Sequence, residues 1–464
     1  MTRKFQCKVV PSTWLENTRR RLDCGPYLSG AVEAKELLKR HNVELLANVT
    51  EDIYHAGRES RIWVNSPEHG VPFMSSTGIL ASDLSYLPLI SKKQVASNPR
   101  FTIRNGMTLI TRSGTVGRMA YARADMDGIA CSEDVIRVVP DTQTIKSGYL
   151  YAYLSSRFGV PIVVSGTYGA IIQHIEPQHI ADLPVPRLGG VEDQVHDLVH
   201  RAADAQVESV ELRKRAGALI NGICDFPEKL APGARVFAYS SASSNSILRR
   251  LDATFHNPVA QQAEALTEAA GGISLTDAGV RGFESSRMKQ VFVEEGYGTP
   301  FITSGGIFLK TITPERYLKN QLLGEEESWR INESDTLIAR SGQVGGIIGR
   351  GVWADGRFDG FAASPHILRL RTTSDDFPPG YVYAFLCLTD VGYQLLARTA
   401  AGSSVPFLPL DAILEIKIPG RPTGAERQEV DYLVKQSGEL RKLSQDLEVE
   451  AVTLVERTIE EESR

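Results

Sequence analysis

The stretch NGMTLITRSGTVG at residues 105–117 returns 228 residues later as ESDTLIARSGQVG at residues 333–345, with eight of the thirteen positions identical. In both copies the β-favouring residues Thr-Leu-Ile run into Ser-Gly-x-Val-Gly, whose glycines suit a tight turn between strands. A match of this length marks an internal repeat, which has to be recognised before any shorter motif is interpreted. We therefore expect one folding unit to occur twice in the chain.

The repeat extends outward from this stretch in both directions. Further matched segments are RRLD at residues 20–23 and 249–252, GVPF at 70–73 with GTPF at 298–301, GY at 148–149 and 380–381, and DLPVP at 182–186 with EIKIP at 415–419. The shift grows only from 228 to 233 residues, which small loop insertions explain. The pattern predicts two tandem domains of mixed α and β structure, with strands at 5–10, 108–110, 135–139 and 366–370 and helices at 33–40 and 148–156.

A long helical segment follows each domain. Starting at Val195 and again at Val430, apolar or small residues recur every three and four positions over more than four heptads. In each stripe one column is mostly leucine and the other mostly alanine and serine, which would let two helix axes approach closely. The leucines of this seam are Leu198, Leu212, Leu219, Leu433, Leu440, Leu447 and Leu454. We expect helix to pack against helix; the alternative is two separate helices, each packed on its own domain.

Composition indicates an ordinary globular protein. The 464 residues are 42% hydrophobic and 23% charged, which suits two or three domains with sizeable cores. No run of about 18 uncharged apolar residues occurs, and no apolar stretch follows the start, so neither membrane insertion nor secretion is expected. Five widely spaced cysteines without a Cys-x-x-Cys pair predict a reducing cytoplasm and no structural zinc site.

The charge is divided unevenly along the chain. The net charge of −5 is the sum of +5 over residues 1–188, −2 over 189–248, −4 over 249–420 and −4 over 421–464. No segment is strongly basic. A nucleic acid could therefore bind only through a local basic face set in acidic surroundings, because phosphate contacts need Lys and Arg on one side.

Known catalytic signatures are only approximated. HDLVH at residues 196–200 lacks the glutamate after the first histidine and the third ligand of a zinc-protease helix, so we place His196 and His200 on a solvated helix face. Asp411, Glu415 and Lys417 are similar to a nuclease pattern, but the first copy has no matching lysine. Neither a phosphate-binding loop, an amino-methyltransferase motif nor a Gly-x-Ser-x-Gly elbow occurs. We expect a binding protein that uses no cofactor and no metal.

The order of these elements resembles the DNA-specificity (S) subunit of type I restriction-modification systems, over nearly the whole chain. The resemblance rests on the Arg-Leu-Asp opening, the Gly-x-Pro-Phe strand, the Thr-Leu-Ile strand into Ser-Gly-x-Val-Gly, and the Pro-ended strand before a helix bearing Gln194 or Gln428. No single element is specific for this family. Their order is specific, because it occurs twice and a long helix follows each copy. The acidic second domain, the Ser-rich connector and the Glu-rich tail depart from the family. They leave open a related methylation-based phage-defence system.

The resemblance implies an α+β fold with two tandem mixed α/β target-recognition domains, joined by two long antiparallel coiled-coil helices with pseudo-two-fold symmetry. The first domain would span residues 1–188, the central helix and connector 189–233, the second domain 234–420 and the C-terminal helix 421–464. Such a subunit does not catalyse. It reads a bipartite target in double-stranded DNA and scaffolds two DNA methyltransferase (modification) subunits, and the family also includes complexes with restriction and translocase subunits.

Candidate DNA contacts are basic residues in loops and the hydroxyl groups of one glycine-containing loop in each domain. They are Lys92, Lys93, Arg100, Arg104, Thr167 and Tyr168 in the first domain, and Arg287, Lys289, Lys310, Arg316, Lys319, Ser403 and Ser404 in the second. Lys and Arg would contact phosphates, and loop hydroxyls with free amides would assist them. Arg112 and Arg340 are identical in register, so we expect them to be structural, because a residue that reads one of two different half-sites should differ between copies.

Two other functional classes remain open from the sequence. The chain could be a stand-alone nucleic-acid-binding repeat protein without a methyltransferase partner, which co-purification would distinguish. It could also be an enzyme whose site has no recognisable motif, which assays of the purified chain with DNA, metal and S-adenosylmethionine would reveal.

Overall fold

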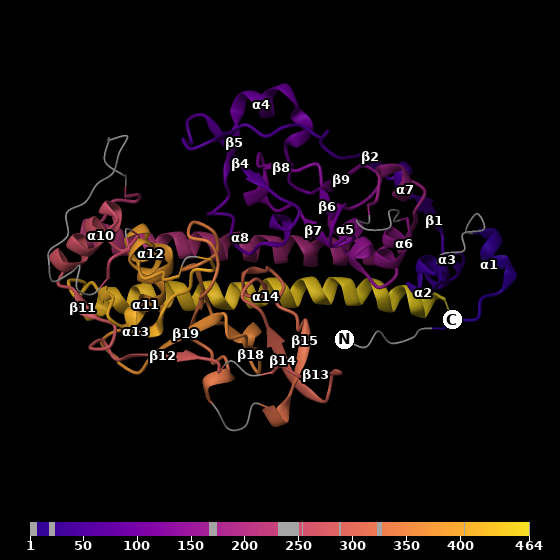
Figure 1. The fold of residues 1–464 in the computed structure, drawn as a ribbon. Coiled ribbons are helices and arrows are strands. Elements are labelled where there is room, and N and C mark those ends of the chain that lie inside the picture. The colour runs from indigo at the N-terminus through magenta and orange to yellow at the C-terminus, as the bar shows by residue number, and fades with distance from the viewer. Residues whose placement is uncertain are drawn as a thin grey trace. The chain divides into compact units, whose positions relative to one another are not determined.

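The computed structural model describes residues 7–17, 24–166, 174–230, 250–252, 254–286, 289–322, 327–402 and 404–463 (Figure 1). The first RRLD motif and the Ser-rich connector lie outside these residues. The chain divides into two compact units: unit 1 contains residues 1–207 and 443–464, and unit 2 contains residues 208–442. The division cuts helix α8 (Val191–Cys224) and helix α14 (Gly424–Glu462), so each unit holds one domain and a part of each helix.

Unit 1 contains three small sheets and seven short helices among its described residues. Their strand orders are β2 (Thr50–Tyr54), β9 (Val135–Pro140), β6 (Thr108–Thr111) and β7 (Met119–Tyr121); β3 (Trp63–Val64), β5 (Leu89–Ser91), β4 (Gly70–Met74) and β8 (Ala130–Cys131); and β1 (Val43–Leu45) with β10 (Pro184–Pro186). The helices are α1 (Ser12–Asn17), α2 (Gly25–Leu28), α3 (Ala31–Leu38), α4 (Lys92–Ser97), α5 (Ser147–Ser155), α6 (Gly159–Ser165) and α7 (Pro177–Ile180).

Unit 2 repeats these sheets strand for strand. The orders are β12 (Val280–Glu284), β19 (Ile367–Thr372), β16 (Thr336–Ala339) and β17 (Gly351–Trp353); β13 (Phe292–Val293), β15 (Arg316–Lys319), β14 (Gly298–Ile302) and β18 (Ala362–Ala363); and β11 (Ile273–Ser274) with β20 (Lys417–Ile418). Its helices are α10 (Pro258–Ala269), α11 (Pro379–Leu388), α12 (Asp390–Arg398) and α13 (Leu410–Leu414). Pairs β4·β8 and β14·β18 are parallel at matching places. The predicted duplication and the α+β class are confirmed.

The repeated Gly-Tyr motif acquires a physical reason in this fold. A Cβ on Gly148 would lie 2.9 Å from the Cα of His196 on α8, and one on Gly380 would lie 2.8 Å from the Cα of Asp431 on α14. Glycine therefore lets α5 and α11 meet a long helix closely. The next residue of each motif, Tyr149 or Tyr381, donates its hydroxyl to the carbonyl that ends strand β10 or follows β20.

Helices α8 and α14 run antiparallel and pack against each other, as predicted, and Figure 1 shows them side by side. The hydroxyl of Ser437 donates to the carbonyl of Ser209 at 2.9 Å, and the hydroxyl of Ser444 donates to the carbonyl of Ala202 at 2.6 Å. As the residue number rises on one helix it falls on the other, which defines the antiparallel sense. Small residues therefore occupy the helix contact, where backbones approach closely.

The seam leucines lie mostly beside this contact, towards the domain cores. Leu198 and Leu454 pack against the core of unit 1, and Leu212, Leu219 and Leu433 pack against or within the core of unit 2. Leu447 is also buried, whereas Leu440 is half-buried. Each long helix thus contributes one face to its partner helix and another to a domain.

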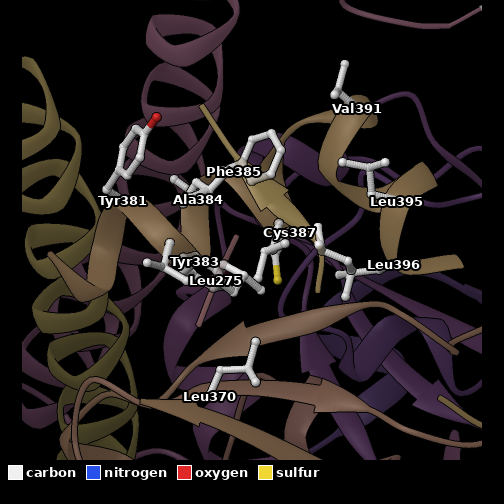
Figure 2. Close-up of a cluster of buried hydrophobic side chains, with 14 of the residues drawn as sticks. Leu275, Leu370, Tyr381, Tyr383, Ala384, Phe385, Cys387, Val391, Leu395 and Leu396 are labelled. Atoms are coloured by element: carbon white, nitrogen blue, oxygen red, sulfur yellow. The ribbon is translucent and has the colours of Figure 1, made fainter. Parts of the chain in front are cut away.

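The core of unit 2 centres on α11, which is buried nearly all round. Figure 2 shows Tyr381, Tyr383, Ala384 and Phe385 of this helix gathered with Leu395 and Leu396 of α12 and with Leu370 of β19. The matching helix of unit 1, α5, is buried in the same way. A helix without a polar face can form only inside a core, so α5 and α11 are the centres of the two domains.

One predicted strand is wrong. Residues 7–10 form no strand, residues 1–6 lie outside the described part, and the first described element is α1. Val9 is 93% exposed, so the apolar alternation that suggested a strand has no neighbouring strand or core to bury it. Within the described residues, no helix is both long and apolar enough to cross a membrane.

Candidate nucleic-acid interface

Lys92 and Lys93 open the short helix α4 on the sheet β3-β5-β4-β8 of unit 1. Both side chains are exposed, and the first turn contains no acidic residue. A helix start carries partial positive charge, so two lysines there weaken the helix slightly. Their position is therefore not explained by the stability of α4, and it offers two cations to an anionic ligand.

A basic and aromatic segment that the sequence analysis missed lies beside these lysines. Residues 57–63 read GRESRIW, and Gln94 of α4 holds this segment by accepting from the amide of Ile62 at 3.0 Å and donating to the carbonyl of Ser60 at 2.8 Å. Arg58 is exposed, and Trp63 is half exposed with its inner side edge-on to Phe73. Two arginines and a tryptophan within residues 58–63 were the available signal.

The other two basic candidates of unit 1 are exposed, but only one is fixed by its neighbours. The guanidinium of Arg100 lies over the ring of Tyr54 at 4.9 Å and reaches Asp52 at 3.6 Å. Arg104 is exposed near the turn that precedes β6. Because an exposed ion pair is weak, Asp52 leaves Arg100 available to a phosphate.

In unit 2 the structure brings Lys289, Arg316 and Lys319 together around the sheet β13-β15-β14-β18. Arg316 and Lys319 are the two ends of β15, and Lys289 is exposed just before β13. The guanidinium of Arg316 lies over Phe292 at 4.9 Å, and Tyr297 nearby in sequence is 75% exposed. Arg287 lies outside the described residues. This sheet matches the one that carries Lys92 and Trp63 in unit 1.

Lys310 does not belong to this sheet. It is half-buried beyond β14, and its carbonyl accepts a hydrogen bond from Nη1 of Arg357 at 2.6 Å. Three exposed acidic residues, Glu294, Glu295 and Glu315, accompany the strands of unit 2. Acidic residues therefore interrupt the basic face of unit 2, as the exposed Glu59 and Glu68 interrupt that of unit 1.

The two arginines expected to be structural are both ion-paired, but their acidic partners come from different parts of the repeat. Arg112 pairs with Glu176, which also lies 3.4 Å from Nε2 of His55, and Arg340 pairs with Glu284 at 2.7 Å. His55 directly follows strand β2, and Glu284 is the last residue of the matching strand β12. Both positions precede the strand, β3 or β13, beside which the exposed cations lie. These ion pairs tie each Ser-Gly-x-Val-Gly turn to the start of the segment that carries the exposed cations.

The hydroxyl-bearing loops are only partly described. Thr167, Tyr168 and Ser403 lie outside the described residues. Ser404 is exposed, and the same loop continues to Phe407, which bridges to Ser341 in the Ser-Gly-x-Val-Gly turn. In unit 1 the corresponding bridge joins Ser113 to His174. In unit 2 the turn is thus adjacent to the loop that carries Ser404, and in unit 1 it is adjacent to His174.

The expectation that His196 and His200 face solvent is wrong. Nδ1 of His196 accepts from the amide of Gly148 at 3.2 Å, and Nε2 of His200 lies 2.8 Å from the hydroxyl of Tyr121. Burial lowers the pKa of His196. These residues lie off the helix–helix contact but on a second contact with the domain, which a single heptad stripe does not reveal. Among the described residues, no group of three acidic, histidine or cysteine side chains could hold a metal ion.

Each unit therefore presents the same combination: exposed cations, a partly exposed aromatic side chain on a small sheet, and a glycine-rich turn with an adjacent loop. Cations can contact phosphates, while aromatic and loop residues can contact sugars or base edges. At matching places the residues differ: Trp63 lies edge-on to Phe73 in unit 1, whereas Phe292 lies edge-on to Phe301 in unit 2. Lys92 directly follows β5, whereas Asn320 directly follows β15. Each of these surfaces thus offers groups whose chemistry suits an anionic polymer.

No model of a protein family matches the chain, and no curated protein matches it. Among solved structures, it is similar to the type I restriction-modification S subunit from M. genitalium, with 12% identity, a TM-score of 0.38, and 91% of this chain and 95% of that chain covered. It is similar to the HsdS subunit from Thermoanaerobacter tengcongensis, with 15% identity, a TM-score of 0.27, and 90% and 96% covered. It is also similar to a chain from a structure that describes complex assembly and conformational transition of the type I R-M system. The identity is 15%, the TM-score is 0.27, and 91% of this chain and 97% of that chain are covered.

Proposed function

We propose that the chain is the DNA sequence-recognition subunit of a multisubunit methyltransferase of the type I kind. Residues 1–188 and 234–420 would each read one short tract of double-stranded DNA, and the two tracts would flank an unread spacer. The helices α8 and α14 would dock two modification subunits. The chain itself would neither methylate nor cleave.

The observation that carries this proposal is the strand-for-strand duplication, in which both copies keep the basic sheet and the glycine-rich turn. A protein that reads one sequence needs one such surface, whereas a bipartite target needs two with different side chains. Structural residues such as Arg112 and Arg340 are retained between copies, while the exposed candidates change. This is the division expected when phosphate contacts position a domain and variable residues specify the base sequence.

A domain replacement tests the reading function. Residues 24–186 are exchanged for the same span of a related protein, and methylated bases are mapped by long-read sequencing of host DNA. We expect one half of the methylated sequence to change while the other half and the spacer length stay the same. A change in both halves would contradict the proposal. No methylation difference between hosts with and without the unaltered chain would favour the stand-alone binding protein.

Salt dependence tests the phosphate contacts of α4. Lys92→Ala/Lys93→Ala should weaken binding of the assembled complex to target and non-target DNA alike. It should also reduce the slope of log K against log salt by roughly 0.9 for each phosphate that is no longer neutralised. Lys39→Ala/Lys417→Ala is the matched control, because it removes two exposed lysines paired with Glu36 and Glu268, outside the candidate interface and outside the two long helices. Equal slopes for the two double variants would remove Lys92 and Lys93 from the interface.

A further inference from the structure

Each unit contains an arginine–aspartate pair just after strand β7 or β17, and the order of the two residues is reversed between the units. Both residues are buried in unit 2, whereas in unit 1 the arginine is buried and the aspartate is half-buried. In unit 1, Arg123 contacts Asp125 at 3.0 and 3.1 Å. In unit 2, Asp355 receives both hydrogen bonds from Arg357, at 2.7 and 2.9 Å. The positions match, because β7 and β17 and the turns after them are related by one shift of 232 residues.

The long helices differ at the position that meets this pair in unit 2. The amides of Gly148 and Gly380 mark the register, since they bond His196 on α8 and Asp431 on α14. Ten residues further along each helix lie Gln206 and Arg441, whose exposed fractions are 0% and 1%. Unit 1 therefore combines Arg, Asp and Gln, whereas unit 2 combines Asp, Arg and Arg.

One carbonyl shows that these differences compensate each other. In unit 1 the carbonyl of Ser82 accepts from Nε2 of Gln206 at 2.9 Å. In unit 2 the matching carbonyl, that of Lys310, accepts from Nη1 of Arg357 at 2.6 Å. The helix supplies the donor in one unit and the domain supplies it in the other. Arg441 is thereby left to face Asp355, with 3.7 Å between Nε and Oδ2.

The charges of unit 2 depend on this pairing. None of the guanidinium nitrogens of Arg441 has a hydrogen-bond acceptor among the described residues, so the carboxylate of Asp355 is its nearby counter-charge. Burial, helped by the charge of Arg357, lowers the pKa of Arg441 to about 9, and Asp355 opposes both. Burial would raise the pKa of Asp355, but Arg441 and Arg357 outweigh it and hold that pKa below its ordinary value.

We propose that residues 123, 125 and 206 in unit 1 and residues 355, 357 and 441 in unit 2 form a matching code that assigns each domain to its own helix segment. If the first domain met residues 431–441 of α14 in place of residues 196–206 of α8, Arg123 would face Arg441, and two like charges would repel. If the second domain met residues 196–206 of α8, Asp355 would face the uncharged Gln206. The code excludes exchange of the two helix segments within one chain, and it excludes pairing of either domain with the non-matching segment of a second copy.

A mutant cycle in unit 2 tests the code. D355R/R357D gives unit 2 the order found in unit 1, so an arginine at position 355 would face Arg441, and we expect a clear drop in thermal midpoint. Adding R441Q places glutamine where unit 1 has Gln206, where it can donate to the carbonyl of Lys310. The triple variant should regain most of that midpoint and of the amide-exchange protection in residues 351–358 and 437–444. The matching control in unit 1 is R123D/D125R with and without Q206R, in which the added arginine should again restore the midpoint.

A second cycle applies if D355R/R357D does not fold. The variant D355N removes the carboxylate that faces the guanidinium of Arg441. The double variant D355N/R441Q also removes the buried guanidinium charge. We expect the double variant to unfold at a higher temperature than D355N alone. The proposal is overturned if R441Q lowers the midpoint equally in all backgrounds, because additivity would mean that residue 441 does not sense the pair. These measurements need no DNA, so their outcome is independent of the proposed DNA-reading function.

Discussion

The two units share a backbone plan but not the chemistry that holds it. The amide of Gly148 is bonded by a histidine ring, and the amide of Gly380 is bonded by the carboxylate of Asp431. The buried arginines Arg137 and Arg369 lie at the same place in β9 and β19 but contact different acceptors. The two copies therefore keep the positions at which a hydrogen bond or a close backbone approach is required. The side chains that form these contacts differ between the copies.

The largest difference between units is expected at the buried arginines. Nη1 and Nη2 of Arg137 donate to the carbonyls of Ser132, Val135 and Phe101, at 2.7 to 3.2 Å. Arg137→Met would leave several buried carbonyls without donors, which should cost roughly 4 kcal/mol of unfolding free energy.

Arg369 provides the counterpart of this experiment in unit 2. It contacts Ser285 and Ser328, and burial lowers its pKa to about 10, so its charge is less well compensated. Arg369→Met should therefore cost less, about 1 to 2 kcal/mol. Urea unfolding with amide exchange resolved by unit measures both effects. Equal destabilisation would show that these arginines have equivalent roles in the two copies.

Substitutions of Gly148 and Gly380, where α5 and α11 approach the long helices closely, should destabilise the two units to a similar extent. Gly148→Val and Gly380→Val would force a side chain into the backbone of α8 or α14, at a cost of about 2 to 3 kcal/mol each. Gly57→Val and Gly305→Val are controls, because a Cβ at either position meets nothing within 4 Å and neither has a positive φ. Amide exchange should report the effect in the substituted unit. A comparable effect from the controls would attribute it to valine itself.

The smallest difference concerns pH. Burial, His200 and Lys146 lower the pKa of His196, with Asp197 and Asp193 opposing, so this histidine stays neutral in the native state where the unfolded chain already binds a proton. Stability of unit 1 should therefore fall as pH drops below about 6.5, the ordinary histidine value. Unit 2, with Asp431 in the same role, should lack this component.

The variant His196→Asp isolates that component. It supplies unit 1 with the acceptor that unit 2 uses, so the urea midpoint of unit 1 should change less between pH 7.5 and 5.5 than in the unaltered chain. An unchanged pH dependence in this variant would assign the effect to another group.

Sequence predicted the repeat, the strands around Thr108 and Thr336, and the two long helices, because each depends on local periodicity or on comparing the chain with itself. The antiparallel sense of the helices was expected only from the family resemblance. Sequence did not predict the contacts of His196 and His200, because a heptad stripe describes one contact face and these helices have two. The strand expected at residues 5–10 failed for the opposite reason: alternation indicates a strand only when another strand is available to pair with it.

The candidate DNA surface was predictable only in part. Lys92, Lys93 and Arg100 stood out as a local run of cations, but Arg58 and Trp63 belong to the same face through Gln94, which lies more than thirty residues away. Lys310 looked equivalent to the other basic residues in sequence, yet its backbone is engaged by Arg357. Side-chain partners of this kind depend on the fold and leave no periodic signal.

The division of the chain has a consequence for how it is synthesised. Unit 1 begins at the first residues but includes residues 443–464, and the carbonyl of Ser463 accepts a hydrogen bond from Arg40 across 423 positions. Residues 208–442, which form unit 2, must be translated before that contact can exist, and at about 5 to 20 residues per second this takes on the order of 10 to 50 s. The domain that leaves the ribosome first is therefore the last to be completed. During that interval Val199 and Ala203 on α8 can already be buried with the domain, whereas the part of the core that Ile459 fills waits for the end of the chain.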